Sequence, residues 1–85
     1  MVVFVITVQG FEEMKPLINS GKYPVWFSGG IKEQDYIDNC IVEGVDVSYF
    51  NYEIELTDNE AIVGAIQTIN EHHPGERIWT EYKLN

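Results

Sequence analysis

The chain has 85 residues, 45% of them hydrophobic, which is enough for one domain with a single core and too few for two domains. Fourteen aspartates and glutamates against five lysines and arginines give a formal net charge of −9. This excess repels nucleic acid and anionic membranes and attracts basic proteins, so we expect one acidic domain, residues 1–85, that binds neither nucleic acid nor a membrane directly.

The first predicted element is a strand at residues 2–8. Its residues are apolar on both faces apart from Thr7, a pattern typical of a central strand that is covered on both sides, or on one side by a partner. The run is much shorter than the roughly 20 apolar residues of a membrane span and has no basic flank. We therefore expect a buried strand rather than a signal peptide or a membrane span.

A short helix and a second strand follow. The helix is predicted at about residues 12–20, and Pro16 suits it only in the first turn, so we expect a late start. The strand is predicted at residues 23–28. Because Pro24 has no N–H to donate to a neighbouring strand, this strand should lie at a sheet edge or begin there.

A second helix is predicted at residues 32–43, after a turn at residues 28–30. Ile37, Cys40 and Ile41 are spaced to form its buried face.

From Val45 the pattern changes to the period of two that is typical of a strand. The phase of this alternation shifts near Tyr49–Asn51, which indicates a bulge or a tight turn there. Beyond the shift, Glu53 and Glu55 share the solvent face of the predicted strand.

The last helix and the last strand follow. Thr57 and Glu60 form a capping box that opens a helix at residues 58–71, and residues 77–84 are predicted as a strand. The buried face of the helix is expected to contain four residues: Ile62, Ala65, Ile66 and Ile69.

The predicted order of elements is therefore βαβαβαβ. It indicates an α+β fold with one small sheet of about four to five strands and helices packed on it, of which a ferredoxin-like arrangement is one variant. The sequence leaves the strand order open.

Residue types that carry chemistry do not form a convincing active site. Residues 28–30 lack the longer glycine pattern of a phosphate-binding loop and are predicted to be a turn. His72 and His73 would point about 100° apart on a helix, so they chelate a metal poorly even with Glu71 nearby. Cys40, the only cysteine, lies on a predicted buried face and cannot form an intramolecular disulfide, which favours a reducing, cytoplasmic location. We expect no catalysis, no cofactor and no metal.

Exposed carboxylates and aromatic rings are the remaining functional signal. Aromatic anchors inside a charged rim are typical of protein interfaces. The predicted partner surface consists of Glu33, Asp35, Asp38, Glu43, Glu53, Glu55, Asp58, Glu60, Tyr49 and Tyr52.

These residues favour a small inhibitor that binds a basic protein. By mimicking nucleic acid, it would block the basic cleft of a nuclease or another nucleic-acid enzyme, as viral counter-defence and toxin-neutralising proteins do. The alternative is an oligomeric structural or regulatory subunit, for example a homodimer, in which a second copy completes the first strand or the aromatic third strand. A small enzyme or ligand-binding domain is the third hypothesis.

Overall fold

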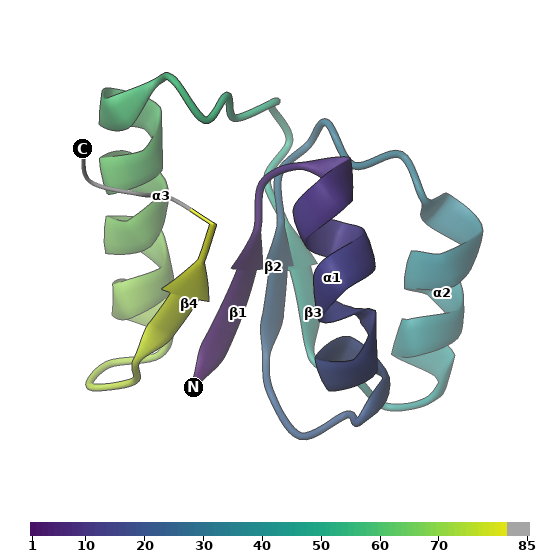
Figure 1. Ribbon diagram of the computed structural model, residues 1–85. Helices are drawn as coiled ribbons and strands as arrows, with labels where there is room; N and C mark the ends of the chain where they lie inside the picture. Colours follow the sequence, from purple (N-terminus) through teal and green to yellow (C-terminus); the bar gives the residue numbers. More distant parts are fainter. Residues whose placement is uncertain (82–85) are drawn as a thin grey trace.

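Four parallel strands form one sheet in the computed structural model, which describes residues 1–81. The strands are β1 (Val2–Val5), β2 (Val25–Phe27), β3 (Val47–Tyr49) and β4 (Ile78–Thr80), and their spatial order is β3-β2-β1-β4. They alternate with the helices α1 (Val8–Asn19), α2 (Gln34–Val42) and α3 (Asn59–His72) (Figure 1). The predicted class and the order βαβαβαβ are confirmed. The ferredoxin-like variant is not confirmed, because every strand pair in the described residues is parallel.

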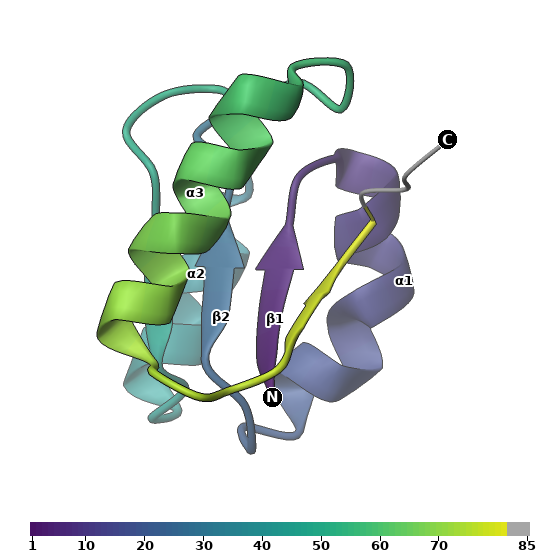
Figure 2. The ribbon, with the colours of Figure 1, turned by 90° about the vertical axis from the view of Figure 1, so that its left-hand side faces the viewer.

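Helices cover both faces of this sheet. Val3 and Val5 pack in the core with α1 and α2, whereas Val2 and Phe4 pack in a second core with α3, and all four side chains are fully buried. α3 lies on one side of the sheet, and α1 and α2 lie on the other (Figures 1 and 2). The prediction of a first strand that is covered on both sides is therefore confirmed, although β1 itself ends at Val5.

The connections place the starts of all three helices at one end of the sheet. α1 and α2 lead the chain from β1 to β2 and β3, and α3 then crosses the opposite face to bring β4 to the free side of β1. Because the strands are parallel, their carboxyl ends meet the amino ends of the helices at the top of Figure 1. We call this region the carboxyl end of the sheet. It is the end at which open α/β sheets bind ligands.

α1 begins earlier than its sequence predicts. Thr7 caps it by accepting a hydrogen bond from the Gly10 N–H (3.1 Å), so the helix starts at Val8 and Pro16 lies inside it. The prediction of a late start was wrong. The early start buries Phe11 completely, and this burial outweighs the loss of the one amide donor that proline lacks.

The end of β3 and the start of α3 also differ from the prediction. β3 ends at Tyr49 and residues 50–57 are irregular, so the phase shift marks the end of a strand, and Glu53 and Glu55 do not lie on one. α3 is capped by Asp58, which accepts from the Ala61 N–H (3.1 Å), and not by Thr57. Aspartate caps as well as threonine does, and here it stands directly before the first helical residue.

The buried faces of two helices are narrower than predicted. Ile37 and Cys40 are buried, but Ile41 is 52% exposed, because α2 lies at the β3 side of the sheet and buries only one row of its side chains. On α3, Ile66 is only partly buried.

β2 and β4 resolve two further expectations. Pro24 directly precedes β2, which is an interior strand, so this proline marks the start of the strand and not a sheet edge. β4 confirms a strand within predicted residues 77–84, of which residues 82–84 lie outside the described part.

No helix within residues 1–81 combines the length and the apolar character needed to span a membrane.

Candidate functional site

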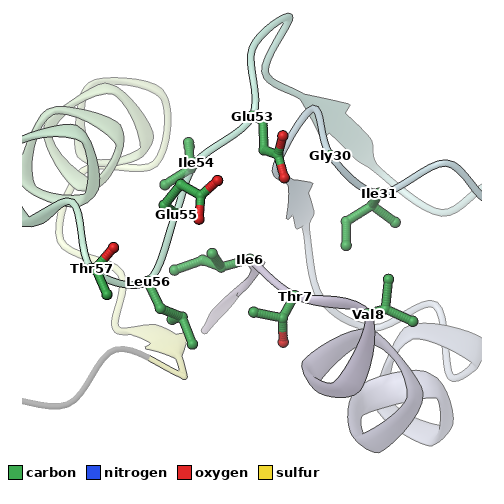
Figure 3. Close-up of a pocket in the computed structure, with 10 residues that line it drawn as sticks. All are labelled: Ile6, Thr7, Val8, Gly30, Ile31, Glu53, Ile54, Glu55, Leu56 and Thr57. Carbon is green, nitrogen blue, oxygen red and sulfur yellow. The ribbon is translucent and has the colours of Figure 1, made fainter.

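Two hollows flank the loop that follows β2 at the carboxyl end of the sheet. The first has a volume of about 350 Å³ and lies between the start of α1 and residues 53–57 (Figure 3). Its walls combine Ile6, Thr7 and Ile31 with the exposed segment that carries Glu53 and Glu55. The second, of about 330 Å³, lies between the same loop, the start of α2 and the end of β3.

The loop after β2 holds residues 50–57 in place. The hydroxyl of Ser28, which is 1% exposed, accepts hydrogen bonds from the Ile54 N–H (2.8 Å) and the Gly30 N–H (3.3 Å). The Gly29 N–H donates to the Tyr52 carbonyl (2.9 Å). A Cβ atom on Gly29 would stand 2.6 Å from that carbonyl oxygen, so only glycine fits. Residues 28–30 therefore form the predicted strand-to-helix turn, and they use their polar groups to anchor the neighbouring segment.

This anchoring directs two carboxylates outward. Ile54 is buried between Glu53 and Glu55, and both glutamates are exposed. In Figure 3 Glu53 extends toward Gly30, and Glu55 lies on the rim of the first hollow. The alternation of polar and apolar residues at positions 53–55 predicted a strand. The segment is irregular instead, but the alternation still separates the buried Ile54 from the exposed glutamates on either side.

The fold gathers eight of the ten predicted partner residues at the carboxyl end of the sheet. α2 and α3 each begin with two acids, β3 ends on a tyrosine, and the irregular segment supplies the remaining three. The eight residues are Glu33, Asp35, Tyr49, Tyr52, Glu53, Glu55, Asp58 and Glu60. Asp38 lies one turn further along α2, and Glu43 follows α2 at the opposite end of the sheet. A carboxylate near a helix amino end is stabilised by the helix dipole, so this end tolerates clustered negative charge.

Few cations accompany these acids. The stretch from Glu33 to Glu76 contains no lysine or arginine, yet it holds eleven of the fourteen acids, at positions 33, 35, 38, 43, 46, 53, 55, 58, 60, 71 and 76. The ion pairs within residues 1–81 join Lys15 to Glu12 (3.1 Å) and the amino terminus to Glu76 (3.4 Å). None of the predicted partner carboxylates makes an ion pair within the described residues.

Tyrosines complete this surface. The side chains of Tyr49 and Tyr52 are 56% and 47% exposed, whereas Trp26 is buried and Tyr23 and Trp79 pack partly against the core. The expectation that some of the aromatic residues lie outside the core is confirmed for these two tyrosines.

Glu81, directly after β4, is a further carboxylate at the carboxyl end of the sheet, and the sequence did not reveal its contacts. Its carboxylate accepts hydrogen bonds from the N–H groups of Ile6 (2.7 Å) and Thr7 (3.0 Å) and from the Thr7 hydroxyl. It occupies the space beside Gly10 that a Cβ atom would need. Glu81 therefore ties the end of β4 to the start of α1. Nothing local in the sequence indicates this contact, because it depends on the pairing of β4 with β1.

The other reactive side chains are used in packing. Cys40 is buried in the core as predicted, and burial raises the pKa of its thiol, which keeps it neutral and weakly nucleophilic. Burial and the nearby Cys40 raise the pKa of Tyr36 to about 12. The ring of His72 packs against Trp26. No cluster of three or more His, Cys, Asp or Glu side chains within residues 1–81 could hold a metal ion.

Comparison with known proteins adds no family to this description. The chain matches no protein-family model, and no curated protein or solved structure shows significant similarity to it.

Proposed function

We propose that this protein binds a basic protein through the carboxyl end of its sheet and acts as a stoichiometric inhibitor of a nucleic-acid enzyme. The main support is that six of the eight predicted partner carboxylates gather at one end of the fold, and that none of them makes an ion pair within the described residues. A basic cleft that binds nucleic-acid phosphates would meet a comparable field of fixed negative charge there. A cytoplasmic setting, in which Cys40 stays a thiol, belongs to the same proposal.

The carboxyl end suits such binding because its acids are held in fixed positions. The buried Ser28 hydroxyl orders the segment that carries Glu53 and Glu55, and helix starts hold the other carboxylates. Tyr49 and Tyr52 offer exposed rings between these charges. Rigid aromatic contacts inside an acidic rim supply binding energy, while the charge speeds the encounter and selects a basic partner.

A pair of charge-reversed variants tests the location of the interface. The first variant, Glu53→Lys with Glu55→Lys, changes the carboxyl end of the sheet. The second, Glu43→Lys with Glu71→Lys, changes the opposite end. Each substitution adds +2, so each variant has a formal net charge of −5 instead of −9. Binding to and inhibition of a panel of purified basic nucleases are measured at two salt concentrations. The first pair should weaken inhibition by about tenfold or more and the second by far less.

Two further measurements separate mimicry from non-specific attraction. Duplex DNA should compete with the wild-type protein for the nuclease, and binding should weaken steeply between about 0.05 and 0.2 M salt. Equal losses in both variant pairs, or failure to inhibit any nuclease of the panel, would contradict the proposal.

The alternative function is that of an oligomeric subunit, and the fold allows one of the two strand pairings that this alternative predicted. β1 pairs with β2 on one side and β4 on the other, so a second copy cannot complete the first strand. A second copy could still reach the sheet at its β3 edge. Sedimentation at increasing protein concentration measures this directly.

A further inference from the structure

Within residues 1–81, the hydrogen-bonding groups on the outer edge of β3 have no strand partner. The Val25 N–H donates to the Asp46 carbonyl, and the Phe50 N–H donates to the Phe27 carbonyl (both 2.9 Å). In a parallel pair with this register, residues 46, 48 and 50 bond toward β2. The N–H and C=O groups of Val47 and Tyr49 therefore point away from the sheet, and the strand order places no described strand beside them.

The surface beside this edge is acidic and partly apolar. Gln34, Asp38 and Ile41 follow one another along one face of α2, and a hydrogen bond from the Gln34 side-chain amide to the Asp38 carboxylate (2.7 Å) confirms their alignment. Gln34 and Tyr49 line the same hollow, so this row runs beside the β3 edge.

The charge beside this edge is mostly negative. Asp46 is exposed directly before β3, and Ile41 is half exposed on α2. From Glu33 to Tyr49 the chain contains no lysine or arginine, and Lys32, directly before this stretch, is the cation that lines the second hollow with Gln34 and Tyr49.

We propose that an extended, basic segment of the partner protein adds to the sheet as a strand beside β3. The outward groups of Val47 and Tyr49 would pair with its backbone. Lysine or arginine side chains at alternate positions of the segment would face the α2 surface that contains Gln34, Asp38 and Ile41, with Asp38 as the charged partner. Strand addition draws its affinity from backbone pairing and its specificity from such alternate side chains. The inference rests on the proposed function, because it names how a basic partner is held.

A second copy of this chain fits the same edge less well. A twofold-related copy would bring the two α2 faces that carry Asp38 toward each other, and each molecule carries a net charge of −9. Like charges that approach each other repel. A basic segment is instead attracted to the carboxylates of this edge.

The test uses the full chain and a synthetic peptide of alternating lysine and valine. Its control is the same peptide methylated at every backbone nitrogen, which keeps the charge but cannot donate backbone hydrogen bonds. We expect the methylated peptide to bind at least about tenfold more weakly in an NMR titration. With the unmodified peptide, hydrogen exchange at the amides of Val47 and Tyr49 should slow by at least about tenfold, because these N–H groups become hydrogen-bonded.

A protein variant tests the charged part of the inference. Asp38→Lys should weaken binding of the unmodified peptide by about fivefold or more, whereas Glu71→Lys, with the same change in charge at the far end of α3, should have little effect. Circular dichroism establishes that both variants fold.

Three results would overturn strand addition. These are equal binding of the two peptides, unchanged exchange at Val47 and Tyr49, and a concentration-dependent dimer that protects these same amides without peptide. Inhibition of a nuclease that is lost on reversing Glu53 and Glu55, together with equal peptide binding, would refute strand addition and leave the proposed function standing. Confirmed strand addition without inhibition of any nuclease would refute the proposed function and leave strand addition standing.

Discussion

The contact between Glu81 and the start of α1 predicts a stability effect that the sequence would not suggest. Replacing Glu81 with alanine removes the acceptor for the N–H groups of Ile6 and Thr7 and for the Thr7 hydroxyl. It also removes the side chain that joins the end of the edge strand β4 to the rest of the fold. We expect Glu81→Ala to destabilise the protein.

The size of the effect follows from these contacts. A hydrogen bond to a charged group contributes about 1.5–3 kcal/mol when it is shielded from water. Because Glu81 is only partly buried, water replaces part of each bond, and we expect a total loss of about 2 kcal/mol. In a domain of this size, that loss lowers the melting temperature by roughly 8–16 °C.

Urea and thermal unfolding followed by circular dichroism measure this loss. Glu76→Ala is the matched control, because its carboxylate makes one exposed ion pair with the amino terminus, and the free energy of unfolding should change by less than about 0.5 kcal/mol. Glu81→Gln should lie between the two, since its amide oxygen can still accept both backbone N–H groups. If Glu81→Ala unfolds within about 0.5 kcal/mol of the wild type, the carboxylate does not tie β4 to α1 and the reasoning is refuted.

Three further predictions concern single positions. Gly64→Ala should stabilise the protein by about 0.5–1 kcal/mol, because Gly64 lies inside α3 with nothing within 4 Å of a new Cβ atom; thermal unfolding that shows a loss would contradict this. Gly29→Ala should destabilise it by about 1–3 kcal/mol or more, because the new methyl group would meet the Tyr52 and Phe50 carbonyl oxygens at 2.6 and 2.8 Å; a neutral urea melt would show that the loop adjusts freely. The pKa of Tyr36, raised from 10.0 to about 12 by burial, means that the folded protein keeps the phenol proton longer than the unfolded chain does. The free energy of unfolding should therefore fall as the pH rises from about 10 to about 12, and Tyr36→Phe should remove this component when the two proteins are unfolded in urea at pH 9 and pH 11.

Local sequence patterns determined most of the elements. The apolar run of Val2–Val5 predicted a strand with two covered faces, and the spacing of Ile62, Ala65 and Ile69 predicted the buried face of α3. These predictions succeed because side-chain periodicity directly reflects burial. Boundaries were less predictable: Pro16 indicated a late start for α1, but the burial of Phe11, which depends on a distant strand, decided otherwise.

Composition alone indicated an acidic, exposed surface, but only the tertiary structure decided where it lies. Glu33 is far from Glu53 and Asp58 in sequence, and the three share one end because the strands are parallel and every helix starts there. The contact between Glu81 and Thr7 and the free edge of β3 depend on the strand order β3-β2-β1-β4. Strand order follows from long-range pairing and from the face on which α3 crosses, and neither leaves a periodic signal in the sequence.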